Sequence, residues 1–153
     1  MALADYLCRD AVCMDLAARQ RDDAIRALLN ALVESGHLSA DELGGLLRAI
    51  LDREALGSTA IGRGLAVPHA RWQGLDGVLV CFGYSRAGVA FNALDGEPVH
   101  QIFLVVAPKG EADEYLNVMQ RITRLVRNSD FRRFVAAAKT EKDLVELISE
   151  MDR

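Results

Sequence analysis

Apolar residues recur every three or four positions in five stretches of the chain, which is the spacing of an amphipathic helix. The first stretch follows Asp22 and ends at Gly36, and the second follows Ser39 and ends near Gly57. Ser39 and Glu42 have the spacing of a capping box, in which each side chain pairs with a backbone amide of the first helical turn. The other three stretches are residues 111–126, 130–138 and 140–151. The last third of the chain is therefore predicted to be helical.

Two of these predicted helices carry aromatic side chains on their apolar stripes. Residues 130–138 should bury Phe131 and Phe134 together with Val135. Residues 111–126 carry Tyr115 and Met119 four positions apart, which places both side chains on one face of the helix.

Two nearly continuous apolar runs, residues 78–84 and 101–107, are typical of strands that are covered on both faces. Residues 93–98 between them have the composition of a turn. A glycine-punctuated segment, residues 57–70, predicts two short strands joined by a turn at residues 62–64. Helices before and after these strands predict an α/β protein, namely a three-layer α/β/α sandwich with a small mixed β-sheet.

The size and charge of the chain fit one domain, residues 1–153, and exclude several classes of partner. Lys and Arg number 18 against 22 Asp and Glu, so the formal net charge is −4, and no basic stretch indicates a nucleic-acid surface. No apolar run is long enough to span a bilayer, and residues 1–7 lack the basic and apolar parts of a secretory signal. We therefore expect a cytoplasmic protein without membrane insertion.

The cysteines and histidines argue against a metal or a disulfide framework. Cys8, Cys13 and Cys81 make an odd number, which favours a reducing compartment. No Cys/His pair has the spacing of zinc ligands, so we expect no metal and no cofactor.

Of the three histidines, His69 has the most informative surroundings. It follows Pro68, which stiffens the chain, and the glycines upstream leave backbone amides that could meet an anion. A lone histidine is more often a satisfied surface or core group, and this alternative stays open on the local pattern alone. His37, between two predicted helices, and His100, at the head of a strand, are expected to have structural roles.

Arg53 lies at the end of the second predicted helix, immediately before the glycine-punctuated segment. Its planar guanidinium could hold two phosphate oxygens, or it could be an exposed arginine paired with Asp52 or Glu54, which composition alone favours. The segment is not a Walker loop, because no Gly-Lys-Ser/Thr ends it. No Gly-x-Ser-x-Gly is present either, so a small hydrolase ranks last among the hypotheses.

Asp52-Arg53-Glu54 together with the run Gly-Ser-Thr-Ala-Ile-Gly-Arg-Gly-Leu-Ala-Val-Pro-His-Ala at residues 57–70 resembles a known family. The pattern is similar to the IIA domain of the bacterial phosphoenolpyruvate-dependent phosphotransferase system, fructose/mannitol type, and above all to its stand-alone nitrogen-regulatory members. Residues 91–99 and 131–148 also look like this family, so nearly the whole chain is covered. The resemblance implies the three-layer fold.

The resemblance also implies a function and a site. His69 would accept a phosphoryl group from a histidine phosphocarrier protein, and Arg53, Ser58 and Thr59 would bind or support the phosphate. A IIB domain, a transporter or a sensor kinase would be the downstream partner. Which ring nitrogen of His69 takes the phosphoryl group stays open.

One departure from the family pattern concerns the start of the helix after the last central strand. Members commonly carry a second histidine there, followed by leucine, whereas this chain has Glu114-Tyr115-Leu116-Asn117. A phenol can donate a hydrogen bond to a phosphate oxygen, but it carries no positive charge and its pKa is about 10. The alternative hypothesis is therefore a non-transport, regulatory protein-binding module in which Tyr115 weakens or abolishes phosphotransfer. The resemblance implies a phosphotransferase component with a phosphohistidine intermediate, and whether the chain counts as an enzyme stays open.

Overall fold

The computed structural model describes residues 1–110 and 112–152 of the chain. The helices are α1 (Leu3–Tyr6), α2 (Arg21–Glu34), α3 (Leu43–Ala55), α4 (Ala112–Arg127), α5 (Ser129–Ala137) and α6 (Glu141–Met151), with short 3-10 turns at Arg9–Ala11 and Ala40–Glu42. The strands are β1 (Ala60–Gly62), β2 (Leu65–Ala66), β3 (His69–Trp72), β4 (Leu79–Val89) and β5 (Val99–Pro108). Within the described residues, none of the helices combines the length and the apolar character needed to cross a membrane.

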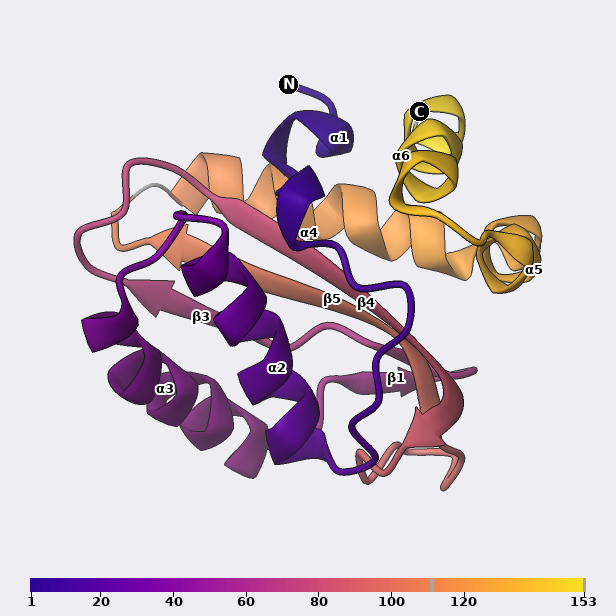
Figure 1. Ribbon diagram of the computed structural model, residues 1–153, viewed down its shortest axis with the longest axis horizontal. Helices are drawn as coiled ribbons and strands as arrows, with labels where there is room; N and C mark the ends of the chain where they lie inside the picture. The colour runs from indigo at the N-terminus through magenta and orange to yellow at the C-terminus, as the bar shows by residue number, and fades with distance from the viewer. Residues whose placement is uncertain (111, 153) are drawn as a thin grey trace.

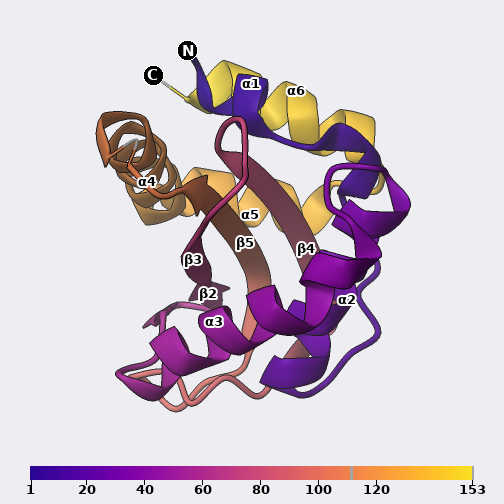
Figure 2. The same ribbon diagram turned by 90° about the vertical axis from the view of Figure 1, so that its left-hand side faces the viewer.

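The elements form three layers, as the sequence predicts. Helices α2 and α3 cover one face of the sheet, and α1, α4, α5 and α6 cover the other (Figures 1 and 2). Each interface has its own apolar core, one built around α2 and α3 and one around α4 and α6. The three-layer α/β/α fold with a mixed sheet is therefore confirmed.

Strand β5 is the centre of the sheet, which explains its nearly continuous apolar sequence. It pairs antiparallel with β4 on one edge and parallel with both β2 and β3 along the other. The register places Leu65 opposite Gln101 and His69 opposite Val105. Strands β2 and β3 thus follow one another along the same edge of β5, and His69 begins the second of them.

Strand β3 was not anticipated from the sequence, whereas the short hairpin before it was. β1 and β2 are antiparallel and are joined at Arg63 and Gly64, which have φ angles of 58° and 79°. Two positive φ angles in a two-residue connection define the hairpin turn that matches the twist of the strands. β3 is formed by the mixed sequence His-Ala-Arg-Trp, which has no apolar run, and it exists through its pairing with β5.

The prediction that Phe134 is buried is wrong. Its side chain is 46% exposed, while Phe131 and Val135 are fully buried. Helix α5 packs against α4 and α6 through one narrow stripe, and Phe134 lies beside that stripe. The guanidinium of Arg133 stacks over the Phe134 ring at 5.1 Å and covers part of it.

Candidate functional site

His69 is half-buried at the first position of β3, directly after Pro68. Its Nδ1 atom lies 2.8 Å from the carbonyl oxygen of Val67. A carbonyl oxygen can only accept a hydrogen bond, so Nδ1 carries the proton in the neutral ring. The lone pair is then on Nε2, which is the ring nitrogen available as a nucleophile or base.

The carbonyl of Val67 is itself held by a relay of hydrogen bonds that reaches back to helix α3. The Val67 amide donates to the carbonyl oxygen of Thr59 at 3.1 Å. The Thr59 amide donates to Oε2 of Glu54 at 3.1 Å, and the Thr59 hydroxyl donates to Oε1 of the same carboxylate. Glu54 and Thr59 are only 3% and 6% exposed. The position of the imidazole is therefore fixed from the end of α3.

The hydroxyl groups of Ser58 and Thr59 are both used inside the protein. Ser58 Oγ donates to the carbonyl oxygen of Phe91 at 3.0 Å and accepts from the amide of Ala60 at 3.1 Å. Thr59 donates to Glu54, as described above. Both residues line the cavity beside His69, and their hydrogen bonds hold the segment that carries the histidine.

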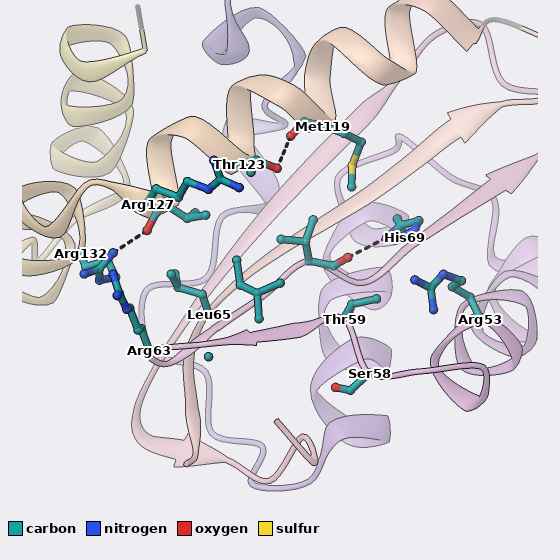
Figure 3. A pocket seen from close by; sticks show the side chains of 14 residues that line it. Arg53, Ser58, Thr59, Arg63, Leu65, His69, Met119, Thr123, Arg127 and Arg132 are labelled. Atoms are coloured by element: carbon teal, nitrogen blue, oxygen red, sulfur yellow. Dashed lines mark hydrogen bonds between the residues drawn. The ribbon is translucent and has the colours of Figure 1, made fainter. Parts of the chain in front are cut away.

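Arg53 lies in the last turn of α3, and its side chain enters the same cavity as His69 (Figure 3). Its Nη1 atom donates to the carbonyl oxygen of Gly57 at 2.9 Å. The interpretation that Arg53 pairs with Asp52 or Glu54 is wrong, because Asp52 faces Arg48 and Glu54 turns inward to Thr59. The guanidinium is therefore directed toward the site rather than toward a neighbouring carboxylate.

Tyr115, in the first turns of α4, approaches His69 from the other side of the site. The two ring centroids are 6.2 Å apart, with an angle of 48° between the ring planes. Burial raises the pKa of the Tyr115 phenol above its ordinary value, and the charges of Arg71 and Arg53 partly oppose this shift. The phenol therefore stays protonated at neutral pH and can donate a hydrogen bond.

Arg71 also belongs to the site, and the sequence analysis missed it. Its guanidinium lies 4.8 Å from the centre of the Tyr115 ring, a cation–π geometry, and its Nε donates to the carbonyl oxygen of Pro108 at 3.1 Å. The available signal was its position two residues after His69, since alternate residues of a strand share a face. Glu54 was missed as well, although it lies four positions after buried Ile50 on the same helix.

The cavity beside His69 has a volume of about 720 Å³. The floor is formed by Leu65 and Val67, and one wall by Met119 and Thr123 of α4. Arginine side chains line it as well, and the described residues of its lining include no carboxylate. The site thus combines an imidazole nucleophile with a positively charged surrounding, which suits transfer of an anionic group.

The other two histidines form hydrogen bonds away from the cavity, and Cys8 and Cys81 are buried. His37 Nε2 lies 2.7 Å from Oδ1 of Asp10, and this hydrogen bond lowers the pKa of Asp10. His100 Nδ1 faces the carbonyl oxygen of Ser85 at 2.8 Å. Burial raises the pKa of Cys8 to about 11 and also raises that of the fully buried Cys81. In the part of the chain that the structure describes, no group of three potential metal ligands occurs.

The fold and the site together define an α/β protein that presents one imidazole in a cationic cavity. The family described as "Phosphoenolpyruvate-dependent sugar phosphotransferase system, EIIA 2" matches residues 5–151, and the chain belongs to this family. It is a IIA-type component, and a role as a phosphoryl carrier is supported at the level of the family.

Relatives of two kinds resemble the chain. The fructose-specific EIIABC component of Bacillus subtilis (strain 168) is 27% identical over 153 residues, which are 100% of this chain but 24% of that protein. The chain thus spans about a quarter of this relative. A nitrogen regulatory protein of Bradyrhizobium diazoefficiens is 26% identical over 149 residues, which are 97% of this chain and 95% of that protein.

Solved structures share the fold. The nitrogen regulatory protein IIA-Ntr from Neisseria meningitidis has a TM-score of 0.85 at 23% identity, covering 95% of this chain and 98% of that one. The Escherichia coli enzyme IIAMTL, solved in complex with phosphorylated enzyme IIBMTL, has a TM-score of 0.73 at 20% identity. The match covers 94% of this chain and 96% of that one.

Proposed function

We propose that His69 accepts a phosphoryl group on Nε2 from a histidine phosphocarrier protein and holds it or passes it on. The observation that supports this assignment is the 2.8 Å hydrogen bond from Nδ1 to the Val67 carbonyl, which leaves the lone pair on Nε2. Nε2 attacks the phosphorus atom of the donor phosphohistidine in line. A P–N bond forms on His69 as the donor's P–N bond breaks, and the electron pair of the broken bond stays on the donor ring nitrogen.

The acceptor ring becomes positively charged in this step. The Nδ1 proton remains on the ring after Nε2 binds phosphorus, and this N–H continues to donate to the Val67 carbonyl oxygen, which stabilises the charge. The donor ring, if protonated on its other nitrogen, leaves as neutral imidazole. No additional base is needed for the exchange.

Arg53 and Tyr115 are assigned to the phosphoryl oxygens. The guanidinium of Arg53 supplies positive charge from the end of α3, and the Tyr115 phenol supplies a hydrogen bond without charge. Arg71 orients Tyr115 through the cation–π contact. Ser58 and Thr59 act indirectly, through the hydrogen bonds that hold the segment before His69.

The test is phosphorylation by phosphoenolpyruvate, enzyme I and the phosphocarrier protein, followed by intact mass spectrometry. One acid-labile phosphoryl group is expected on the wild type, none on His69→Ala, and one on the matched control His100→Ala. Nitrogen-15 NMR of the phosphorylated ring should show substitution at Nε2. Unchanged labelling of His69→Ala, or substitution at Nδ1, would contradict the proposal.

A second candidate function is favoured by Tyr115, which stands where the resemblance implies a second histidine. The chain would then act as a regulatory module whose contacts with a protein partner matter more than its rate of phosphotransfer. The 95% coverage of a nitrogen regulatory relative supports this candidate. The partner could be a transporter or a sensor kinase in place of a IIB domain.

The variant Tyr115→His separates the two functions. If phosphotransfer has been weakened, this change should raise the phosphorylation rate by at least about tenfold, the effect of one charge-assisted hydrogen bond. A rate within about threefold of the wild type would show that the phenol suffices. Binding of candidate partners to the wild type, His69→Ala and His69→Asp then tests regulation, and equal binding of all three forms would count against it.

We infer that the protein acts in the cytoplasm. Cys8, Cys13 and Cys81 are all free thiols, which fits a reducing compartment. Fractionation of cells followed by detection of the untagged protein would test this placement, and recovery from the periplasm would contradict it.

A further inference from the structure

Three arginines gather at the end of the cavity that lies away from His69. Arg63 comes from the turn between β1 and β2, Arg127 from the end of α4, and Arg132 from α5 (Figure 3). Two contacts with β5 mark the ends of the cavity. Gln101 of β5 donates a side-chain hydrogen bond to the carbonyl oxygen of Arg132 at 3.1 Å, and Val105 of β5 pairs with His69. Because these two β5 residues are four positions apart and a strand rises about 3.3 Å per residue, the two ends are roughly 13 Å apart.

No carboxylate of the described residues forms an ion pair with these three guanidinium groups. None of the ion pairs among residues 1–110 and 112–152 involves Arg63, Arg127 or Arg132. Arg132 Nη1 donates to the carbonyl oxygen of Val126 at 2.7 Å, which fixes the side chain but balances no charge. The C-terminus of α4 favours a cation at Arg127, but this explains only one of the three. Like charges gathered without a counter-charge repel one another and attract an anion.

Arg63 is held in a backbone conformation that a glycine would adopt more easily. Its φ angle is 58°, in the left-handed region that costs a residue with a side chain about 1 kcal/mol. Its amide donates to Oδ2 of Asp95 at 2.9 Å, and this hydrogen bond lowers the pKa of Asp95. Asp95 therefore secures the backbone of the turn, while the guanidinium reaches into the cavity. The hairpin turn accounts for this backbone conformation, and it places the Arg63 side chain in the lining of the cavity.

We propose that this end of the cavity is a second anion-binding subsite, which takes a small organic anion carrying a phosphate or a carboxylate group. The forked guanidinium groups suit either anion, and the buried Leu65 and Val67 offer an apolar floor for the body of the ligand. The whole cavity, which also includes the His69 end, has a volume of about 720 Å³, so it has room for a small molecule beside the imidazole. The subsite does not depend on phosphorylation of His69.

The test is an NMR titration of the unphosphorylated protein with inorganic pyrophosphate and, separately, with citrate. We expect saturable shifts of the side-chain Nε–H signals of Arg63, Arg127 and Arg132. Pyrophosphate binding alone would identify a phosphate ligand, and citrate binding alone a carboxylate ligand. The double variant Arg63→Gln/Arg127→Gln should weaken binding at least about tenfold. If that variant does not fold, Arg127→Gln alone gives the same comparison.

The matched control is Arg26→Gln, which removes one positive charge from an exposed position on α2 in the opposite layer. It should leave binding unchanged. The proposal is overturned if neither anion binds, if Arg26→Gln weakens binding as much as the cavity variants, or if the shifts are confined to His69 and Arg53. It is also overturned if the cavity variants leave anion binding unchanged and, in a separate assay, weaken only the binding of the phosphocarrier protein. The arginines would then serve a protein interface. No donor is present in the titration, so its failure is distinct from a failure of phosphotransfer.

Discussion

The substitution Glu54→Ala is expected to destabilise the protein and, separately, to slow phosphorylation of His69. Glu54 accepts two hydrogen bonds from Thr59, one from the amide and one from the hydroxyl. Thr59 then accepts from the amide of Val67, whose carbonyl holds the imidazole. Removing the carboxylate leaves two buried donors without an acceptor at the start of this relay.

The magnitude follows from those two donors. A buried donor that loses its partner costs about 1–3 kcal/mol, so two of them cost about 2–6 kcal/mol. The lower half of this range applies, because the space left by the shortened side chain can admit water. We expect the free energy of unfolding to fall by about 3 kcal/mol, which in a chain of this size lowers Tm by about 6–12 °C. Looser placement of the ring should slow phosphorylation about tenfold.

Urea unfolding measures the first effect, and the rate of phosphorylation at a temperature where both forms are folded measures the second. Glu54→Gln is the conservative control, since its amide oxygen keeps one of the two acceptors. This variant should lose about half as much stability as Glu54→Ala. The double-mutant cycle with Thr59→Val isolates the hydroxyl contact. A decrease in the free energy of unfolding below about 1 kcal/mol would mean that the desolvation of the carboxylate offsets the stabilisation from its hydrogen bonds. A stability loss with an unchanged rate would refute the relay.

Two further predictions concern stability and are checked by urea unfolding. Gly83→Ala should lower the free energy of unfolding by about 2 kcal/mol, because the new Cβ would lie 2.8 Å from Cδ2 of Leu28 in the core. The control is Gly44→Ala on α3, whose Cβ would meet no atom within 4 Å. This variant should raise the free energy of unfolding by about 0.5–1 kcal/mol, and an equal loss of stability in both variants would contradict the packing argument. Asp152→Asn should cost about 2 kcal/mol, because Arg121 donates to both oxygens of a side chain that is 3% exposed; an unchanged midpoint would show that this pair contributes nothing.

The helices could be predicted because their ends are encoded locally. Gly36 follows the end of α2 with a φ angle of 83°, and Thr140 and Asp143 form the capping box that begins α6. The central strand β5 was equally clear, since burial on both faces requires an apolar run. These features depend on neighbours within a few residues, which a single sequence displays.

The missing features depend on partners that are distant in the sequence. β3 forms because residues 69–72 pair with residues 105–108, and nothing within its four residues signals this. Arg63 and Arg132 are separated by 69 positions, and only the packing of the β1–β2 turn beside α5 brings them to one cavity. His69 itself was found from its motif, but its free nitrogen was decided by a hydrogen bond to Val67 that the sequence does not reveal.

The charge around His69 is largely independent of pH, and this follows from Tyr115. Arginine side chains remain protonated throughout the neutral range, and burial keeps the Tyr115 phenol in its uncharged form. A histidine at position 115 would add a group that titrates near neutral pH, whereas the phenol adds none. The net charge of −4 thus says little about the site, because positive charge is concentrated in the cavity beside His69.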